Sequence, residues 1–282
     1  MLSIITLTFN NYHQLVETLN SIPNDNSVES VVVNGGQCID TLNYLKSHKG
    51  KVISEKDDGI SDAFNKGIYA STAEFIMILN SGDVLLNKDY LFRAERILKE
   101  NCNVFFVHSN IIFEERYAGS LTMYPKMKNI GRGMPYLTET IVIKRSVFDL
   151  VGLYRNDYKF SMDYDLIVRM EKLGMKGQYL NEAPVVKVDG KGVSNTYEIK
   201  TMTETVKSLW ENRHFNFSIV ANLFVRIALF ISRKLTIKIG AKNLFIKLMK
   251  WKYNRAFLLF ALIYFLDQVS LLSDIFVNLL SF

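Results

Sequence analysis

The sequence predicts an α/β protein built on a mostly parallel central sheet, with a helical C-terminal extension. Three observations predict this class. Short apolar runs alternate with helical patterns through roughly the first hundred residues, Asn-, Asp- and Gly-rich turns follow the runs, and the chain after residue 212 becomes basic and apolar. Strands separated by helices imply βαβ units with right-handed crossovers, and therefore a parallel sheet.

The elements follow in order from local patterns. Apolar, β-branched runs predict strands over 3–8, 30–33, 52–54, 75–79, 104–108 and 111–113. Leu15, Leu19 and Ile22 recur on one helical face and predict a helix after the first strand. Further helices are predicted over 40–46, 61–70, 88–98 and 163–173, the last closed by Gly174. A stretch rich in Gly, Pro and Lys at 124–135 is predicted to be a mobile loop.

The charge is unevenly distributed along the 282 residues, whose formal net charge is +6. Residues 1–212 carry 24 basic and 26 acidic side chains, whereas 213–255 carry ten basic and no acidic ones. We therefore expect one domain over 1–212 and an extension over 213–282 that meets an anionic surface. The chain opens without a signal-peptide pattern, and its two cysteines are expected to be reduced core residues, so we expect a cytoplasmic location.

The extension is predicted to lie on a membrane rather than cross it. Its uncharged runs, 214–225 and 256–266, are shorter than the roughly 18 residues of a spanning helix. Extending the second run would place Asp267 inside the bilayer, at a cost of about 2.5–3.5 kcal/mol. A basic amphipathic helix in the interface fits better, with a soluble helical subdomain as the alternative. The long aliphatic stretches between the basic residues argue against nucleic-acid binding.

Polar turns follow the predicted strands, and a parallel sheet should bring them to one edge, where open α/β sheets bind ligands. The turns are 8–11, 34–36, 55–67 and the tetrad Asn80-Ser81-Gly82-Asp83. Asp83 and Asn80 offer hard oxygen ligands for Mg²⁺ or Mn²⁺. Each turn taken singly is better explained by ordinary turn chemistry than by a binding site, whereas four polar, acid-bearing turns on one edge favour a site. The spacing G-x-G-x-x-G is absent, which excludes a dinucleotide-binding dehydrogenase.

A further candidate is Asp163, at the start of a predicted helix. A carboxylate there could simply cap the helix, because the dipole favours negative charge at an N-terminus. It could also act as a general base for a hydroxyl nucleophile. Asp165 lies two residues on, off the same helical face, so the two carboxylates are not expected to act as a pair.

The order of these motifs resembles the family 2 glycosyltransferases of bacterial capsule, O-antigen and exopolysaccharide synthesis, over roughly residues 1–195. The stretch from Ser54 to Gly67 is similar to the family pattern S-E-x-D-x-G-I-x-D-A-x-N-K-G. The tetrad, preceded by Leu79, resembles the family's L-N-S-G-D variant of the metal-binding D-x-D motif. Residues 163–166 with Arg169 resemble the segment whose first Asp is the base, and 190–194 resemble the following G-G-x-S loop.

The resemblance implies a GT-A fold that holds a nucleotide-sugar donor at the sheet edge. Asp83 would hold Mg²⁺ or Mn²⁺ on the diphosphate, and Asp163 would deprotonate an acceptor hydroxyl for inverting attack. Glu139, Asp165 and Arg169 would serve as acceptor or secondary contacts. The donor-binding candidates are Thr8, Asn10, Asn34, Asp57, Asp62, Asn65, Lys66 and Asn80.

The resemblance also implies a lipid-linked saccharide acceptor, which suits an enzyme held on the inner face of the plasma membrane by its extension. Three positions depart from the family pattern: Asn34 replaces an Asp, Thr138-Glu139 replaces His-Gln, and Met162 replaces a Glu. Two rivals stay open. One is a non-catalytic, membrane-associated nucleotide-sugar-binding protein, and the other is a sugar nucleotidyltransferase, although the latter would want a glycine-rich basic loop after the first strand. The sugar, nucleotide, acceptor, linkage and oligomeric state are left open.

Overall fold

The computed structural model describes residues 1–24, 26–115, 119–126, 130–190, 197–215 and 217–238, followed by 240, 241, 243, 244 and 246. The chain forms two compact units, Met1–Phe230 and Ile231–Phe282. Outside the described residues lie 127–129 of the loop predicted to be mobile, 191–194 of the motif at 190–194, and the apolar run 256–266. The division at residue 212 rests on charge and stays a prediction.

A seven-stranded sheet forms the centre of the first unit, in the order β10-β6-β9-β4-β1-β2-β3. All neighbouring pairs are parallel except those of β9, which runs antiparallel to both β4 and β6, so the prediction of a mostly parallel sheet is confirmed. The three-residue strand β9 was not predicted. The strands are β1 (Leu2–Thr8), β2 (Val28–Asn34), β3 (Lys51–Ser54), β4 (Phe75–Ile78), β6 (Val104–His108), β9 (Val142–Lys144) and β10 (Lys176–Tyr179).

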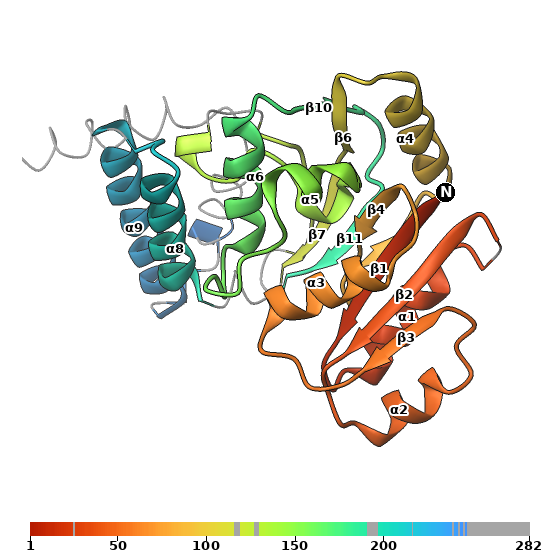
Figure 1. The fold of residues 1–282 in the computed structure, drawn as a ribbon. Coiled ribbons are helices and arrows are strands. Elements are labelled where there is room, and N and C mark those ends of the chain that lie inside the picture. Colours follow the sequence, from red (N-terminus) through yellow and green to blue (C-terminus); the bar gives the residue numbers. More distant parts are fainter. Residues whose placement is uncertain are drawn as a thin grey trace, which may run out of the picture. The chain divides into compact units, whose positions relative to one another are not determined.

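Helices cover both faces of this sheet (Figure 1). Successive side chains of a strand point to opposite faces, and β2 shows the consequence. Val31 and Val33 share a core with Phe64 of α3, whereas Val32 packs in a separate cluster with Leu15 of α1. The helices of this unit are α1 (Tyr12–Ser21), α2 (Ile39–Leu45), α3 (Ile60–Ala70), α4 (Asp89–Glu100), α5 (Ser146–Val151), α6 (Met162–Lys172) and α8 (Glu198–Glu211).

A second, four-stranded sheet adjoins the tetrad at the end of β4. Its order is β5-β11-β7-β8, with β5 (Val84–Leu85), β11 (Val186–Asp189), β7 (Ile111–Glu115) and β8 (Gly119–Met123). β5 starts directly after Asp83 and runs antiparallel to β11, with Val84 opposite Lys187. This pairing brings the end of β11 beside the tetrad, a neighbour that the sequence pattern does not reveal because β5 has only two residues.

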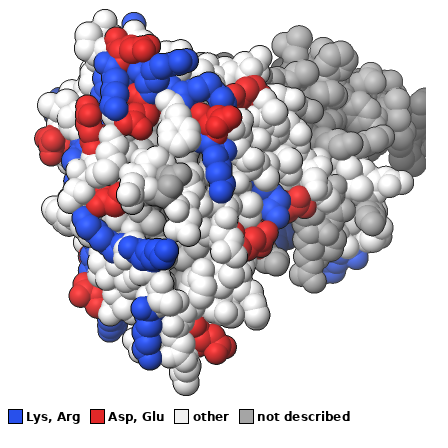
Figure 2. Space-filling view, turned by 90° about the vertical axis from the view of Figure 1, so that its right-hand side faces the viewer, with Lys and Arg blue, Asp and Glu red and all other residues white. Residues whose placement is uncertain are grey.

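Helix α9 (Phe217–Lys238) begins in the first unit and ends in the second. Among the described helices, none has the length and apolarity needed to cross a bilayer. Acidic and basic side chains are interspersed on the face drawn in Figure 2, in keeping with the balanced charge of residues 1–212. Both cysteines are free, but Cys38 is only partly buried and Cys102 is exposed, so the expected core positions are wrong.

Candidate active site

The polar turns that follow β1, β2, β3 and β4 meet at one edge of the main sheet. Thr8, the last residue of β1, lies opposite Asn34, and Asn34 lies opposite Ser54 at the end of β3. The tetrad joins the same edge because the Ser81 N–H donates to the Leu7 carbonyl at 3.0 Å. The expectation that these turns share an edge is confirmed by the register of the strands.

The first two turns are tied together by Asn10. This residue adopts a left-handed backbone conformation, with φ of 55°, which Asn tolerates better than most residues. Its Oδ1 accepts the backbone N–H groups of Gln37 and Cys38 at 2.8 and 2.9 Å. Thr8 donates its hydroxyl to the Asn11 side chain at 2.5 Å. Asn10 and Thr8 therefore fix the conformation of the turns after β1 and β2. Their predicted binding of the donor stays a prediction.

Asn34 and Asp57 organise the second and third turns. The buried Asn34 side chain donates to the Gly36 carbonyl at 3.1 Å and to Ser54 Oγ at 2.9 Å, and accepts the Gly36 N–H at 3.1 Å. The Asn34 side-chain amide therefore makes its hydrogen bonds to Gly36 in its own loop and to Ser54. A Cβ on Gly35 would lie 1.9 Å from Asp57 Oδ2, so only glycine fits beside that carboxylate.

The Asp62 and Lys66 side chains, predicted to bind donor, are engaged with their own loop. Asp62 Oδ2 accepts the Asp58 N–H at 3.0 Å and lies 3.1 Å from Lys66 Nζ. The Asp58 hydrogen bond is the main cause that lowers the Asp62 pKa. Lys66 also donates to the Lys56 carbonyl at 2.8 Å. These contacts stabilise the turn that carries Asp57.

Asn65 connects α3 to the segment that precedes α6. Its amide donates to the Tyr154 carbonyl at 2.8 Å and accepts the Tyr154 N–H at 3.0 Å. One turn earlier, Ser61 Oγ donates to the Tyr158 carbonyl at 2.8 Å. The most specific sequence motif therefore joins the donor edge to the chain segment leading to Asp163.

The tetrad forms a tight turn with unsatisfied polar atoms. Gly82 has φ of 107°, its N–H donates to Thr18 Oγ1 at 2.9 Å, and the Asp83 N–H donates to the Asn80 carbonyl at 2.9 Å. Asn80 Oδ1 and Ser81 Oγ are buried, and neither has a hydrogen-bond partner within the described part of the chain. Buried polar atoms without partners are rare and point to a ligand or an unseen water.

Asp83 lies at the centre of an acidic environment. Burial raises the pKa of its carboxyl well above the usual range, and the negative charge of Glu139 raises it further. Asp189 adds to the negative charge, although hydrogen bonds from the backbone N–H groups of Asp189 and Asn80 act in the opposite direction. A buried carboxylate in negative surroundings is stabilised by a cation placed against it.

Asp163 lies in the first turn of α6, as predicted. Burial raises the pKa of its carboxyl to about 7, with Glu139 as the second cause. Glu139, on a short 3₁₀ helix (Thr138–Thr140), thus acts electrostatically on both Asp83 and Asp163. A cavity of about 30 Å³ borders Asp163. Its other lining residues are Ile76, Ile78, Thr138, Ile141, Ile143, Tyr154, Leu166 and Ile167.

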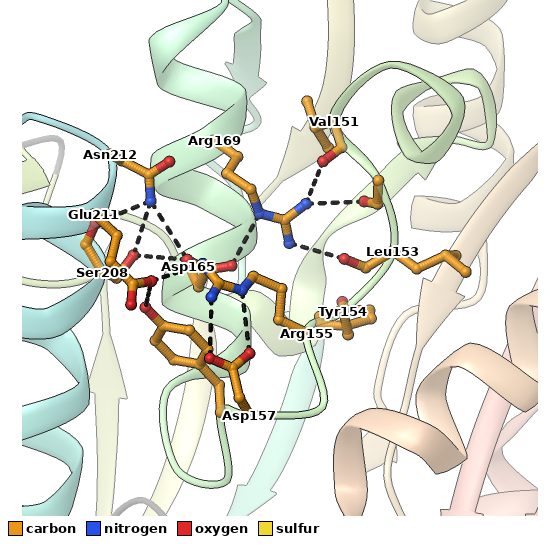
Figure 3. A network of polar contacts seen from close by, with 12 residues as sticks. Val151, Leu153, Tyr154, Arg155, Asp157, Asp165, Arg169, Ser208, Glu211 and Asn212 are labelled. Atoms are coloured by element: carbon orange, nitrogen blue, oxygen red, sulfur yellow. Dashed lines mark hydrogen bonds and ion pairs between the residues drawn. The ribbon is translucent and has the colours of Figure 1, made fainter.

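Asp165 and Arg169 form an internal network (Figure 3). Asp165 is fully buried, pairs with Arg169 at 2.9 Å and accepts a hydrogen bond from Ser208 Oγ at 2.9 Å. The Arg169 guanidinium also donates to the carbonyls of Val151, Gly152 and Leu153. The Asp165 carboxylate and the donors of Arg169 are thus engaged inside the protein, and their role as acceptor or secondary contacts stays a prediction.

Two residues of the site were missed in the sequence. Gln14 of α1 donates to Asp189 Oδ2 at 2.9 Å, and Asp189 ends β11 beside the tetrad. Asp189 follows a strand, which is the signal that marked the other turns, but its strand belongs to the second sheet. Its proximity to Asp83 arises from the pairing of β5 with β11.

The donor atoms at the tetrad fit a hard divalent cation. The Asp83 carboxylate and the partnerless Asn80 Oδ1 supply oxygen, the ligand type that Mg²⁺ and Mn²⁺ prefer. No group of three or more His, Cys, Asp or Glu side chains able to hold a metal occurs among the residues described. A cation here would consequently need further oxygens from a ligand, and diphosphate oxygens are of that kind.

Comparison with known protein families adds to this geometry. The model of the family described as "Glycosyl transferase family 2" matches residues 3–155, more than half of the chain. A relative from Mycobacterium tuberculosis, called "PGL/p-HBAD biosynthesis glycosyltransferase", is 25% identical over 252 residues, which are 84% of this chain and 95% of the relative. An uncharacterised glycosyltransferase of Rickettsia typhi is 22% identical over 234 residues, covering 74% and 70% of the two chains.

Solved structures show the same fold at low identity. The mannosyltransferase of Pyrobaculum calidifontis, in complex with GDP-Man and Mn²⁺, has a TM-score of 0.60 and 14% identity over 93% of this chain and 86% of that chain. Staphylococcus aureus TarS 1–349 with UDP has a TM-score of 0.57 and 17% identity, over 74% of this chain and 65% of that one. The fold is therefore of the GT-A type.

Proposed function

Because the chain belongs to glycosyl transferase family 2, we propose that it transfers a sugar from a nucleoside diphosphate donor to an acceptor hydroxyl with inversion. The observation that carries this proposal is the placement of Asp83 and Asp163. Asp83 follows β4, and Asp163 borders a cavity that is also lined by Ile76 and Ile78 of this strand. Both carboxylates have raised pKa values, and the charge of Glu139 contributes to both shifts. Pairs of carboxyl groups with tuned pKa values are typical of active sites.

The donor nucleoside would lie against the turns after β1, β2 and β3. Thr8, Asn10 and Asp57 line this edge, while Asn34 shapes the loop between them. The nucleoside diphosphates in the complexes named above, GDP-Man and UDP, support a donor of this class.

The diphosphate of the donor would lie over the tetrad. Asp83 and Asn80 would hold Mg²⁺ or Mn²⁺, and a bound metal supplies Lewis-acid stabilisation of the departing diphosphate. The Mn²⁺ present in the mannosyltransferase complex supports a divalent ion. Without a cation, burial and Glu139 disfavour the charged form of Asp83, and the diphosphate would add further negative charge to the same site.

Asp163 would act as the general base. Its ionised carboxylate accepts the proton of the acceptor hydroxyl while the hydroxyl oxygen forms a bond to the anomeric carbon. The bond between that carbon and the diphosphate oxygen breaks, and its electron pair leaves with the diphosphate. A base with a pKa of about 7 is matched to neutral pH, because it is substantially ionised and still accepts a proton readily.

The acceptor we propose is a saccharide linked to a lipid, in the synthesis of a cell-surface polysaccharide at the cytoplasmic face of the plasma membrane. The charge pattern supports this: ten basic and no acidic residues lie between 213 and 255. On the part of α9 that lies in the second unit, Ile231 and Leu235 are one helical turn apart and are 50% and 54% exposed. An exposed apolar stripe in a basic segment suits the headgroup region of an anionic bilayer.

Vesicle sedimentation tests the membrane contact. We expect the full chain to bind anionic vesicles and to be released by salt, because exposed charges are screened. A variant with Ile231 and Leu235 replaced by Ser should lose binding. The control carries Leu150→Ser and Leu173→Ser, which alter exposed leucines elsewhere. Equal sedimentation of the two variants would refute the membrane contact.

A donor screen tests the reaction. UDP-, GDP- and dTDP-sugars are incubated with the full chain, with and without Mn²⁺ or Mg²⁺, and sugar release is measured. We expect metal-dependent turnover of one donor class, abolished by Asp83→Ala and by Asp163→Ala. Donor binding without turnover would favour the non-catalytic rival, and pyrophosphate release from a nucleoside triphosphate would favour the nucleotidyltransferase. Undiminished turnover in both variants would refute the assigned site.

A further inference from the structure

Glu204 of α8 binds the chain segment that leads into α6. Its Oε1 accepts the Lys159 N–H at 2.9 Å, and its Oε2 accepts the N–H groups of Phe160 and Ser161, both at 2.8 Å. One side-chain carboxylate thus takes three consecutive backbone donors. Hydrogen bonds to an ionised acceptor are about twice as strong as neutral ones, and convergent N–H groups form a natural anion site.

The segment held by Glu204 ends immediately before the predicted base. Ser161 occupies the N-cap position of α6, and its side chain makes no capping hydrogen bond to the helix. Its Oγ instead donates to the Thr201 carbonyl of α8 at 2.9 Å. The start of α6 is therefore positioned from α8 rather than by its own cap, and Asp163 is the second residue of that helix.

Other side chains of α8, besides Glu204, contact α6 and the segment before it. Ser208 Oγ donates to Asp165 Oδ1 at 2.9 Å, and the Tyr158 hydroxyl donates to Glu211 Oε2 at 2.9 Å. Figure 3 shows these side chains of α8 turned toward α6 and the preceding segment. With Glu204, they attach α8 on both sides of Asp163 in the sequence, so that α8 determines where the Asp163 backbone lies.

We infer that Glu204 is a positioning residue, which holds Asp163 in the place where it can accept the proton of the acceptor hydroxyl. The inference rests on the proposed role of Asp163 as base. It assigns α8, which carries none of the sequence motifs, to the catalytic machinery. The physical reason is that a base works only within hydrogen-bond reach of the proton it abstracts, and a three-point attachment limits the rotation of the segment before it.

The test compares Glu204→Gln with Thr203→Ala in the full chain. Gln offers a single acceptor oxygen, so at least one of the three N–H groups loses its partner. Thr203 is the neighbouring, exposed residue, and its hydroxyl donates within α8, to the Ile199 carbonyl. We expect Glu204→Gln to lower kcat on the order of 10- to 100-fold, as misplacement of reacting groups does, with donor KM unchanged and Thr203→Ala like the parent.

Two readouts separate positioning from a loss of stability. Amide hydrogen exchange at residues 159–161 should increase in Glu204→Gln, and the acid limb of the kcat pH profile should move. A merely structural role would lower the melting temperature but leave kcat and the pH profile unchanged at low temperature. If Glu204→Gln does not fold, Glu204→Asp, which withdraws the carboxylate by one methylene, takes its place with the same expected loss.

Asp163→Asn distinguishes failure of this inference from failure of the proposed function. If Asp163→Asn is inactive while Glu204→Gln matches Thr203→Ala in kcat and exchange, the positioning role is overturned and the proposed base survives. If Asp163→Asn retains full turnover, the assignment of the base fails, and with it the catalytic meaning of Glu204. Increased amide exchange at residues 159–161 in Glu204→Gln would then still show that Glu204 holds this segment.

Discussion

Two carboxylates on α6, only two residues apart, have opposite surroundings. Asp165 is fully buried, with Arg169 and Ser208 as partners at 2.9 Å each. No ion pair to Asp163 is present in the described part of the chain, and burial together with the charge of Glu139 raises its pKa to about 7. Rotation of about 100° per residue along a helix turns the two side chains to different neighbours. The same residue type is therefore paired inside the fold at one position and is the proposed base at the other.

Two regions of the molecule, the helices α3, α6 and α8 on one side and the tetrad on the other, differ in the same way in how their polar groups are paired. In the framework of α3, α6 and α8, polar groups are paired with one another, as Asn65 with Tyr154 and Glu204 with three N–H groups. At the tetrad, Asn80 Oδ1 and Ser81 Oγ lack partners in the part of the chain that is described. Unpaired polar groups reduce stability, and proteins retain them where a ligand is to be bound.

The largest expected effect concerns activity. Asp163→Asn should lower kcat by about 10²- to 10⁴-fold, the contribution typical of a general base, while donor KM stays the same. Asp165→Asn should change kcat far less when measured on folded protein at low temperature. Initial rates at saturating donor measure both. Equal losses of kcat in the two variants would contradict the assignment of a catalytic role to Asp163 and a structural role to Asp165.

The next effect concerns stability. Arg169→Ala should lower the free energy of unfolding by about 3–5 kcal/mol, because it leaves the buried Asp165 charge without its partner. Urea unfolding of the full chain measures the change. Arg169→Lys serves as the matched variant: it keeps the charge but cannot reach Asp165 and the three carbonyls together, so we expect a smaller loss. Parent-like stability of Arg169→Ala would contradict the role of the network.

Asp163→Asn should have the opposite effect on stability. The pKa of Asp163 in the folded protein, about 7, lies above its ordinary value of 3.8, so the folded state favours the protonated form. Its contribution to stability is present at low pH and is lost as pH rises through about 7. Asp163→Asn should therefore raise the melting temperature at pH 8 and have little effect at pH 4, as scanning calorimetry can check.

A smaller effect concerns the pH profile of kcat/KM. The proposed base role requires ionised Asp163, so the rate should fall as pH drops below about 7. Glu139→Gln removes the negative charge that helps to raise this pKa, and the acid limb should move to lower pH. The movement should be modest, since burial is the larger cause. An acid limb that stays in place would show that Glu139 does not act on Asp163.

The smallest effect is expected for a surface pair within the framework. Lys66 lies 2.9 Å from Glu55 and 3.1 Å from Asp62, with partly exposed side chains. Exposed ion pairs contribute about 0.2–1 kcal/mol, so Lys66→Ala should lower the free energy of unfolding by no more than that. Donor titration of this variant separates the predicted donor contact from the structural one, because only the former would raise donor KM.

The sequence by itself determined the local elements and the edge where they converge. Apolar runs and helical periodicity are local signals, and the rule that parallel strands present their carboxyl ends together needs no coordinates. The sequence therefore predicts that the polar turns share one edge of the sheet. It also marks Asp83 and Asp163 as candidate site residues without any knowledge of their long-range neighbours. The order of motifs also identified the family, which the match over residues 3–155 shows.

Only the tertiary structure decided which polar side chains are engaged in hydrogen bonds and ion pairs inside the protein. Asp165 and Asp163 look alike in sequence, and no local pattern shows that Arg169 donates to three carbonyls at the end of α5 and just after it. Asp189 reaches the tetrad through the two-residue strand β5, and Glu204 reaches residues 159–161 across more than 40 positions. Long-range hydrogen bonds and burial depend on how elements pack, and no local pattern encodes them.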